Sequence, residues 1–204
     1  TLPKGELKLG MVAEVRGSTI TQDEFLDFNS IASSIALSSG IVGPVDAGSI
    51  VNNPPIATTL SVLGRHIVVQ PTTVFTDNAT GGLTALQALM SPGPEPIYIE
   101  VYGLYNAEND SFTATRIELK TSPPENYRVS GKIVAANAST FTIGTGPATL
   151  QINHASATER PANLVAGSVV RLRMAASALS AGVWTANRVR SGVNSPSDGQ
   201  ESKV

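Results

Sequence analysis

The chain has 204 residues, 41% of them hydrophobic, and a net charge of −2 at pH 7, which is enough apolar material to bury a real core in one or two domains or in several small modules. It contains no cysteine, which excludes disulfide bonds, thiolate metal sites and a cysteine nucleophile. No apolar run approaches the roughly 20 residues of a membrane-spanning helix, so we expect no transmembrane segment in this chain.

Short alternating runs of Val, Ile and Thr, together with 18 Gly and 13 Pro, predict an all-β chain of short strands joined by many turns. Two six-residue strings, 112–117 and 184–189, match at every position by residue type or by close substitution. The chain is therefore expected to contain copies of one module. A module that is copied without catalytic groups favours a scaffold or a binding surface over an enzyme.

The N-terminal segment, residues 1–37, resembles the second half of a first repeat whose first strands are absent. Within it, residues 11–17 are similar to 98–103, and residues 31–35 are similar to 113–117. An incomplete barrel leaves strand edges unpaired. Three alternatives stay open: this half pairs with the middle repeat, it associates with another chain such as a second copy, or the sequence cuts through a domain.

Residues 38–121 predict a middle β-barrel repeat with long loop insertions. Two insertions, 48–57 and 76–96, are rich in Gly, Pro, Asn and Thr. Added loop length costs little because closure entropy grows only with the logarithm of loop length. Within the second insertion, residues 83–90 predict a short helix.

Residues 126–191 predict a last β-barrel repeat of five short strands, because apolar residues alternate between turn-forming segments at 137–139, 144–147 and 180–182. Five strands with one long connection suit a small OB-like barrel, in which closure removes the edge strands. The predicted fold is therefore all-β: tandem small OB-like five-stranded β-barrels with an incomplete first copy. The polar residues 192–204 have almost nothing to bury and predict a disordered tail.

The last repeat resembles a tandem bacterial family, domain of unknown function 5666, through the strings at 129–137, 140–143, 164–170 and 184–189. The middle repeat is similar to it at 40–46, 98–103 and 112–117. The resemblance implies small β-barrels in proteins that are often exported, with no established activity and no known catalytic residues. On this basis we expect an exported protein with a binding or structural role in the periplasm or at the cell envelope, where another envelope protein is one candidate partner. The lack of cysteine is compatible with that location.

Charge distinguishes the two repeats. Residues 127–192 carry seven basic residues and one acidic residue, whereas residues 35–120 carry three basic and seven acidic residues. Arg171 and Arg173 share one face of their strand, and Arg188 and Arg190 share one face of the next. If the two strands form a hairpin, four guanidinium groups lie close together.

Guanidinium groups suit phosphate or carboxylate, so Arg171, Arg173, Arg188 and Arg190 are the candidate binding residues for a polyanion: nucleic acid, anionic polysaccharide or lipid headgroups. The alternative is a solvated outer face, or a contact between the basic repeat and the acidic one. Few aromatic residues accompany these arginines, which weighs against single-stranded nucleic acid.

Catalytic motifs are missing from the sequence. There is no Gly-x-Ser-x-Gly elbow, no phosphate-binding loop and no pair of histidines on a helix. His66 and His154 have no partner at ligand spacing, while Phe112 and Trp184 are predicted to fill the cores of their repeats. We therefore expect no enzyme, no cofactor and no metal site; a hydrolase with an unrecognised site would need a deep cleft with two converging carboxylates.

Overall fold

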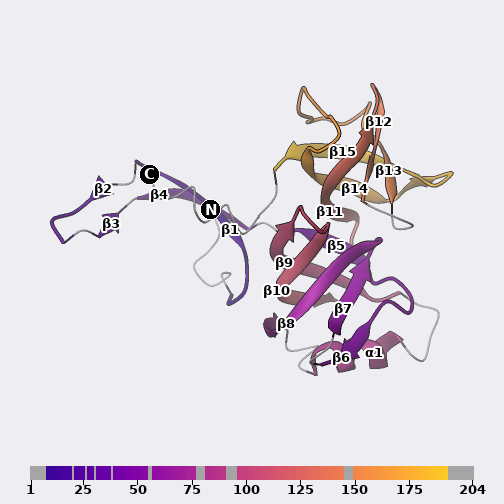
Figure 1. Ribbon diagram of the computed structural model, residues 1–204, viewed down its shortest axis with the longest axis horizontal. Coiled ribbons are helices and arrows are strands. Elements are labelled where there is room, and N and C mark those ends of the chain that lie inside the picture. Colours follow the sequence, from indigo (N-terminus) through magenta and orange to yellow (C-terminus); the bar gives the residue numbers. More distant parts are fainter. Residues whose placement is uncertain are drawn as a thin grey trace.

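The computed structural model describes residues 8–19, 21–25, 27–29, 31–37, 39–54, 57–76, 81–90, 96–144 and 149–192, so the predicted tail lies outside the described residues beyond Gly192. The protein is all-β with one short helix, as predicted, and 11 of its strands belong to one large mixed sheet (Figure 1). Over the described ranges, no helix has the length and apolarity needed to cross a membrane.

The N-terminal strands form a ribbon that projects away from the rest of the protein (Figure 1). Its two ladders are antiparallel: β1 (Ala13–Gly17) pairs with β4 (Ala32–Leu37), and β2 (Thr21–Gln22) pairs with β3 (Phe28–Asn29). At its base the ribbon contacts the main sheet, because Thr115 Oγ1 donates to the carbonyl of Gly10 at 2.7 Å and Arg116 Nη1 donates to that of Leu9 at 3.1 Å. The ribbon thus touches the middle of the chain without pairing with its strands.

The middle unit contains six strands and the helix. These are β5 (Ile41–Pro44), β6 (Val51–Asn53), β7 (Ala57–Val62), β8 (Arg65–Phe75), α1 (Gly82–Met90), β9 (Tyr98–Asn106) and β10 (Ser111–Lys120). The strands pair in the order β5-β9-β10-β8-β7-β6, with β8 and β10 parallel, and a bridge between Val45 and Val62 brings the end of β5 to β7. Leu83 and Leu86 join the core of this unit, so α1 packs against it where the sequence predicted a short helix.

The last unit contains the five strands that the sequence predicted. These are β11 (Asn126–Ala136), β12 (Thr140–Ile143), β13 (Leu150–Asn153), β14 (Val169–Ser180) and β15 (Val183–Ser191). Their pairings form a circuit, β11-β12-β13-β15-β14, which returns to β11 and contains one parallel pair, β13 with β15. The buried side chains between these strands form the second core of the protein.

Phe112 and Trp184 occupy matching places in the two units. Phe112 lies opposite Ile67 on a parallel strand, and Trp184 lies opposite Ile152 on a parallel strand. Their exposed fractions are 2% and 7%, so both are core residues, as predicted. Three residues further on, the register of each closing strand shifts, at Thr115 in β10 and at Asn187 in β15.

The two units share one sheet because β5 pairs with both β9 and β11, the second pairing joining Val42 to Arg128. Aromatic rings also cross the boundary: Tyr98 stacks on Tyr127 with ring centroids 6.4 Å apart, and Tyr127 meets Trp184 edge to face at 5.6 Å. The sequence predicted two separate barrels, whereas the structure gives a continuous sheet across the boundary.

A buried ion pair lies at the same boundary. Arg65 Nη1 lies 2.9 Å from Asp110 Oδ2, and the hydroxyl of Tyr105 donates to Asp110 Oδ1 at 2.6 Å. The guanidinium of Arg65 packs against Gly144 of the last unit, where an added Cβ would overlap it. Gly144 has a φ of +93°, so this position also favours glycine for its backbone conformation.

Candidate functional site

The predicted arginine hairpin forms between β14 and β15. In this antiparallel pair Arg171 lies directly opposite Arg190, and Arg173 lies directly opposite Arg188. Leu172 and Met174, which alternate with the arginines along β14, are buried in the core. Because side chains alternate between the faces of a strand, the four arginines are brought together on the outer face.

Sequence reasoning missed a fifth member of this cluster. Arg128 of β11 lies opposite Arg173, so Arg128, Arg173 and Arg188 form one row across three strands. Arg128 lies between the buried residues Tyr127 and Val129, and Arg171 and Arg173 alternate with buried residues in the same way. This alternation in the sequence could have placed Arg128 on the outer face with them. The five arginines together are called the arginine face below.

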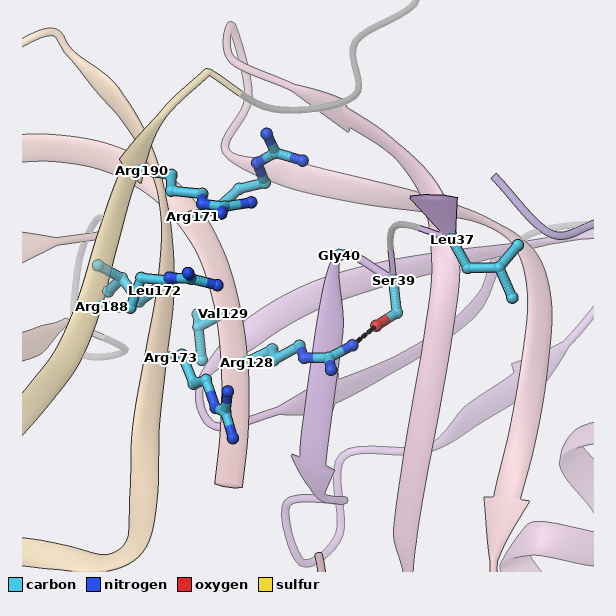
Figure 2. Close-up of a pocket in the computed structure, with 10 residues that line it drawn as sticks. All are labelled: Leu37, Ser39, Gly40, Arg128, Val129, Arg171, Leu172, Arg173, Arg188 and Arg190. Carbon is cyan, nitrogen blue, oxygen red and sulfur yellow. Dashed lines mark hydrogen bonds between the residues drawn. The ribbon is translucent and has the colours of Figure 1, made fainter. Parts of the chain in front are cut away.

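The arginine face lines a pocket of about 240 Å³ between the last unit and the segment that enters the middle unit. Figure 2 shows Arg171, Arg188 and Arg190 extending toward Ser39 and Gly40, whereas Arg173 points away from them. Arg128 Nη1 donates to Ser39 Oγ at 2.8 Å. Leu37, Val129 and Leu172 supply the apolar part of the lining.

One acidic side chain, Glu159, binds two of the arginines from the long connection between β13 and β14. Its Oε2 lies 2.6 Å from Arg188 Nε, and its Oε1 lies 2.9 Å from Arg190 Nε. The hydrogen bond from Arg190 is the main cause that lowers the pKa of Glu159, aided by the charges of both arginines and opposed by partial desolvation. The backbone is fixed as well, since the amide of Val189 donates to the carbonyl of Glu159 at 2.8 Å.

A second carboxylate, Glu100 of the middle unit, lies 3.6 Å from Arg128 Nη1 through Oε1 and forms an ion pair with Lys120. Burial opposes the charged form of Glu100, but hydrogen bonds from Lys120 and Ser39 and the charges of Lys120 and Arg128 outweigh it and lower its pKa. The predicted contact between the basic and the acidic parts of the chain therefore exists at Arg128, and Glu100 helps to orient that side chain.

His66 and His154 lie apart, on different units. His154 is buried beside Phe141, with ring centroids 5.3 Å apart, and its Nδ1 lies 3.3 Å from Arg160 Nη1. Throughout the part of the chain that the structure describes, no group of three or more His, Asp or Glu residues is placed to hold a metal ion.

Two comparisons with known proteins found nothing: no curated protein and no solved structure has significant similarity to the chain. One family model does match. Residues 42–118, which cover most of the middle unit, match a domain of unknown function, DUF5666. This match supports the family that the sequence resembles. It lies on the middle unit, whereas more of the strings that carry the resemblance lie in the last unit. The middle unit is thus similar to a family whose description assigns no activity.

Proposed function

We propose that this protein is a non-catalytic module that binds a polyanion through the arginine face. The observation that carries the proposal is the direct pairing of Arg171 with Arg190 and of Arg173 with Arg188 at one pocket. Like charges directly opposite each other in a sheet destabilise it by roughly 0.2–1 kcal/mol a pair. Neutral polar residues avoid this cost at solvent-facing strand positions, whereas an anion that bridges the guanidinium groups removes it.

The contact with the acidic repeat leaves room for such a ligand. Among the described residues, Glu159 pairs with Arg188 and Arg190, and Glu100 pairs with Arg128. The side chains of Arg128, Arg188 and Arg190 are 49%, 43% and 43% exposed, so an anion from solution reaches them. Guanidinium binds phosphate, sulfate or carboxylate oxygens through paired N–H donors.

The scaffold under this face is proposed to be two copies of one OB-like five-stranded module, residues 38–121 and 126–191. The two units have the same pattern of strand pairing. Taken one by one in chain order, the strands of the last unit (β11, β12, β13, β14 and β15) have the same neighbours and orientations as five strands of the middle unit (β5, β7, β8, β9 and β10). Phe112 and Trp184 with their register shifts support the same equivalence. The pair β1 with β4 is antiparallel, like β9 with β10, which supports residues 1–37 as half of a further copy.

A hydrolase with two converging carboxylates is the enzymatic alternative. Glu100 and Glu118 do lie directly opposite each other on β9 and β10. However, Lys120 contacts both carboxylates, and Arg116 Nε lies 2.7 Å from Glu118 Oε1. Cations therefore neutralise this pair, and we propose a binding role in preference to hydrolysis. The exported, envelope location stays a prediction from the family resemblance.

Calorimetric titration with heparin at low salt tests the proposed function. The double variant Arg173→Gln/Arg188→Gln should bind at least tenfold more weakly than the wild type, because each lost charged contact is worth about 1.5–3 kcal/mol. Lys8→Gln removes one positive charge, against two in the double variant, from an exposed site outside the pocket, and it should bind as the wild type does. No binding by the wild-type protein, or equal losses in both variants, would contradict the proposal.

A further inference from the structure

Two further hollows continue the arginine face around the last unit. The first pocket shares Arg171 and Arg190 with a hollow of about 510 Å³, which also contains Glu159 and Arg160. That hollow shares Arg160 and Pro161 with another of about 300 Å³, which reaches Asn137 and His154. The three hollows therefore form a series whose two junctions each contain arginine.

Arg160 is held in place at the far junction. Its Nη1 lies 3.3 Å from His154 Nδ1, and because a guanidinium has no acceptor, His154 accepts this hydrogen bond. The histidine ring is 4% exposed and stacks on Phe141, so it is a fixed support. Arg160 is thus oriented at the junction in advance of any ligand, which lowers the entropy cost of binding there.

From this series we infer that the ligand is a linear anionic polysaccharide that runs from the arginine face past Arg171 and Arg190 to Arg160. This inference rests on the proposed function and adds the length and the class of the ligand. A single small anion needs only one hollow, and it gains nothing from cations at two successive junctions. A linear polymer with repeated carboxylate or sulfate groups contacts both junctions at once.

The lining residues favour a polysaccharide over nucleic acid. Where the structure describes the three hollows, no Phe, Tyr or Trp lines them, so unpaired bases find no ring to stack on. Stacking contributes about 1–3 kcal/mol per base in single-strand binders. Ser39, Asn137 and Ser191 instead offer hydroxyl and amide groups that suit sugar hydroxyls.

The shape of the site also disfavours a lipid surface. The first pocket lies between the last unit and Ser39 with Gly40, so its guanidinium groups line a recess. Headgroups in a bilayer lie in one plane and reach a recess poorly, whereas a flexible chain enters it. Vesicles are therefore a discriminating probe.

Binding of heparin oligosaccharides of two lengths tests the inference. A dodecasaccharide should bind the wild-type protein at least tenfold more tightly than a tetrasaccharide, at one low salt concentration. Arg160→Gln should weaken dodecasaccharide binding roughly tenfold and leave tetrasaccharide binding unchanged, because the arginine face remains intact. Arg160→Lys keeps the charge and should recover part of the loss, while Lys8→Gln serves as the charge-matched control. The fluorescence of Trp184 checks that each variant is folded.

Two results would overturn the inference of a long ligand that reaches Arg160 and would leave the proposed function standing. One is equal affinity for the two oligosaccharide lengths, and the other is dodecasaccharide binding that Arg160→Gln leaves unchanged. Tighter binding of an oligothymidine of twelve nucleotides, or of phosphatidylglycerol vesicles, would overturn the choice of polysaccharide. If none of these probes binds, the proposed function itself fails.

Discussion

Arg173 lies directly opposite Arg188 across the antiparallel pair of β14 and β15, and Arg128 continues the row on β11. Alternation along each strand puts these residues on the face opposite the core, where Glu100 pairs with Arg128 and Glu159 pairs with Arg188, but three like charges in one row still repel one another. The row is therefore an arrangement that the fold tolerates at a cost, and an anionic ligand offsets that cost.

Replacing Arg173, the central arginine of the row, should stabilise the free protein and weaken ligand binding. Arg173→Gln removes the repulsion from both Arg128 and Arg188, so the free energy of unfolding at low salt should rise by roughly 0.2–1 kcal/mol. The gain should disappear at high salt, where screening already weakens the repulsion. Denaturant unfolding followed by Trp184 fluorescence measures this, and a loss of stability at low salt would show that the row has structural partners instead.

Glu159 should act as an internal competitor of the ligand, since its carboxylate binds Arg188 and Arg190. Glu159→Gln should therefore bind heparin several-fold more tightly. The pKa of Glu159 is lowered, so its carboxylate stays charged in the folded protein until the pH falls below its ordinary value. Heparin affinity of the wild type should rise as the pH falls through that lowered pKa, and the variant should lack this rise. Unchanged affinity in Glu159→Gln would contradict the competition.

The Arg65 contact at the unit boundary can be tested with two glycines of similar conformation. Gly144 and Gly167 have φ values of +93° and +91°, but an added Cβ overlaps the Arg65 guanidinium only at Gly144 and meets nothing within 4 Å at Gly167. Both alanine variants should lose about 1–3 kcal/mol from backbone strain. Gly144→Ala should lose about 3 kcal/mol more, because it displaces Arg65 from Asp110. Equal losses of unfolding free energy in the two variants would contradict the contact.

Glu100 should make the stability depend on acid pH. Its pKa is lowered from 4.5 in the folded state, so the unfolded state binds the proton more readily. The stabilisation is fully present above about pH 4.5 and is lost as the pH falls through the folded-state pKa. Glu100→Gln should reduce the unfolding free energy by about 1–3 kcal/mol at neutral pH, and should show a flatter acid dependence than the wild type. A parallel pH profile for both proteins would rule out this role.

Local patterns in the sequence were sufficient for much of this fold. The period of two predicted the strands of the last unit and the shared face of Arg171 and Arg173, because alternation depends only on neighbouring residues. The matching places of Phe112 and Trp184 in the two similar strings predicted that both are buried, and they are. Residues 83–90 were predicted as a helix, and α1 covers them.

Features that depend on distant pairing were not predictable in the same way. The similarity of residues 40–46 to residues 131–137 matches Gly40 with Gly131. The strand pairing matches Gly43 with Gly131 instead, because Gly43 lies opposite Ile99 and Gly131 lies opposite Val170, the residue at the place of Ile99 in the last unit. Strand register is set by hydrogen bonds to a remote strand, which local similarity does not report. The participation of Arg128 and Ser39 in the pocket depends on the packing of the two units. The strand β6 lies in a predicted loop, and its three residues are all exposed, so it has no alternating signal.

Side-chain NMR of the arginine Nε–H groups during a heparin titration tests the central claim most directly. The account predicts shifts at all five arginines of the arginine face as heparin is added. Arg65 and Arg116, which are buried in ion pairs away from the pocket, should stay unchanged and serve as internal controls. Unchanged resonances across the arginine face under conditions where heparin binds would show that the polyanion uses another surface, and would contradict the account.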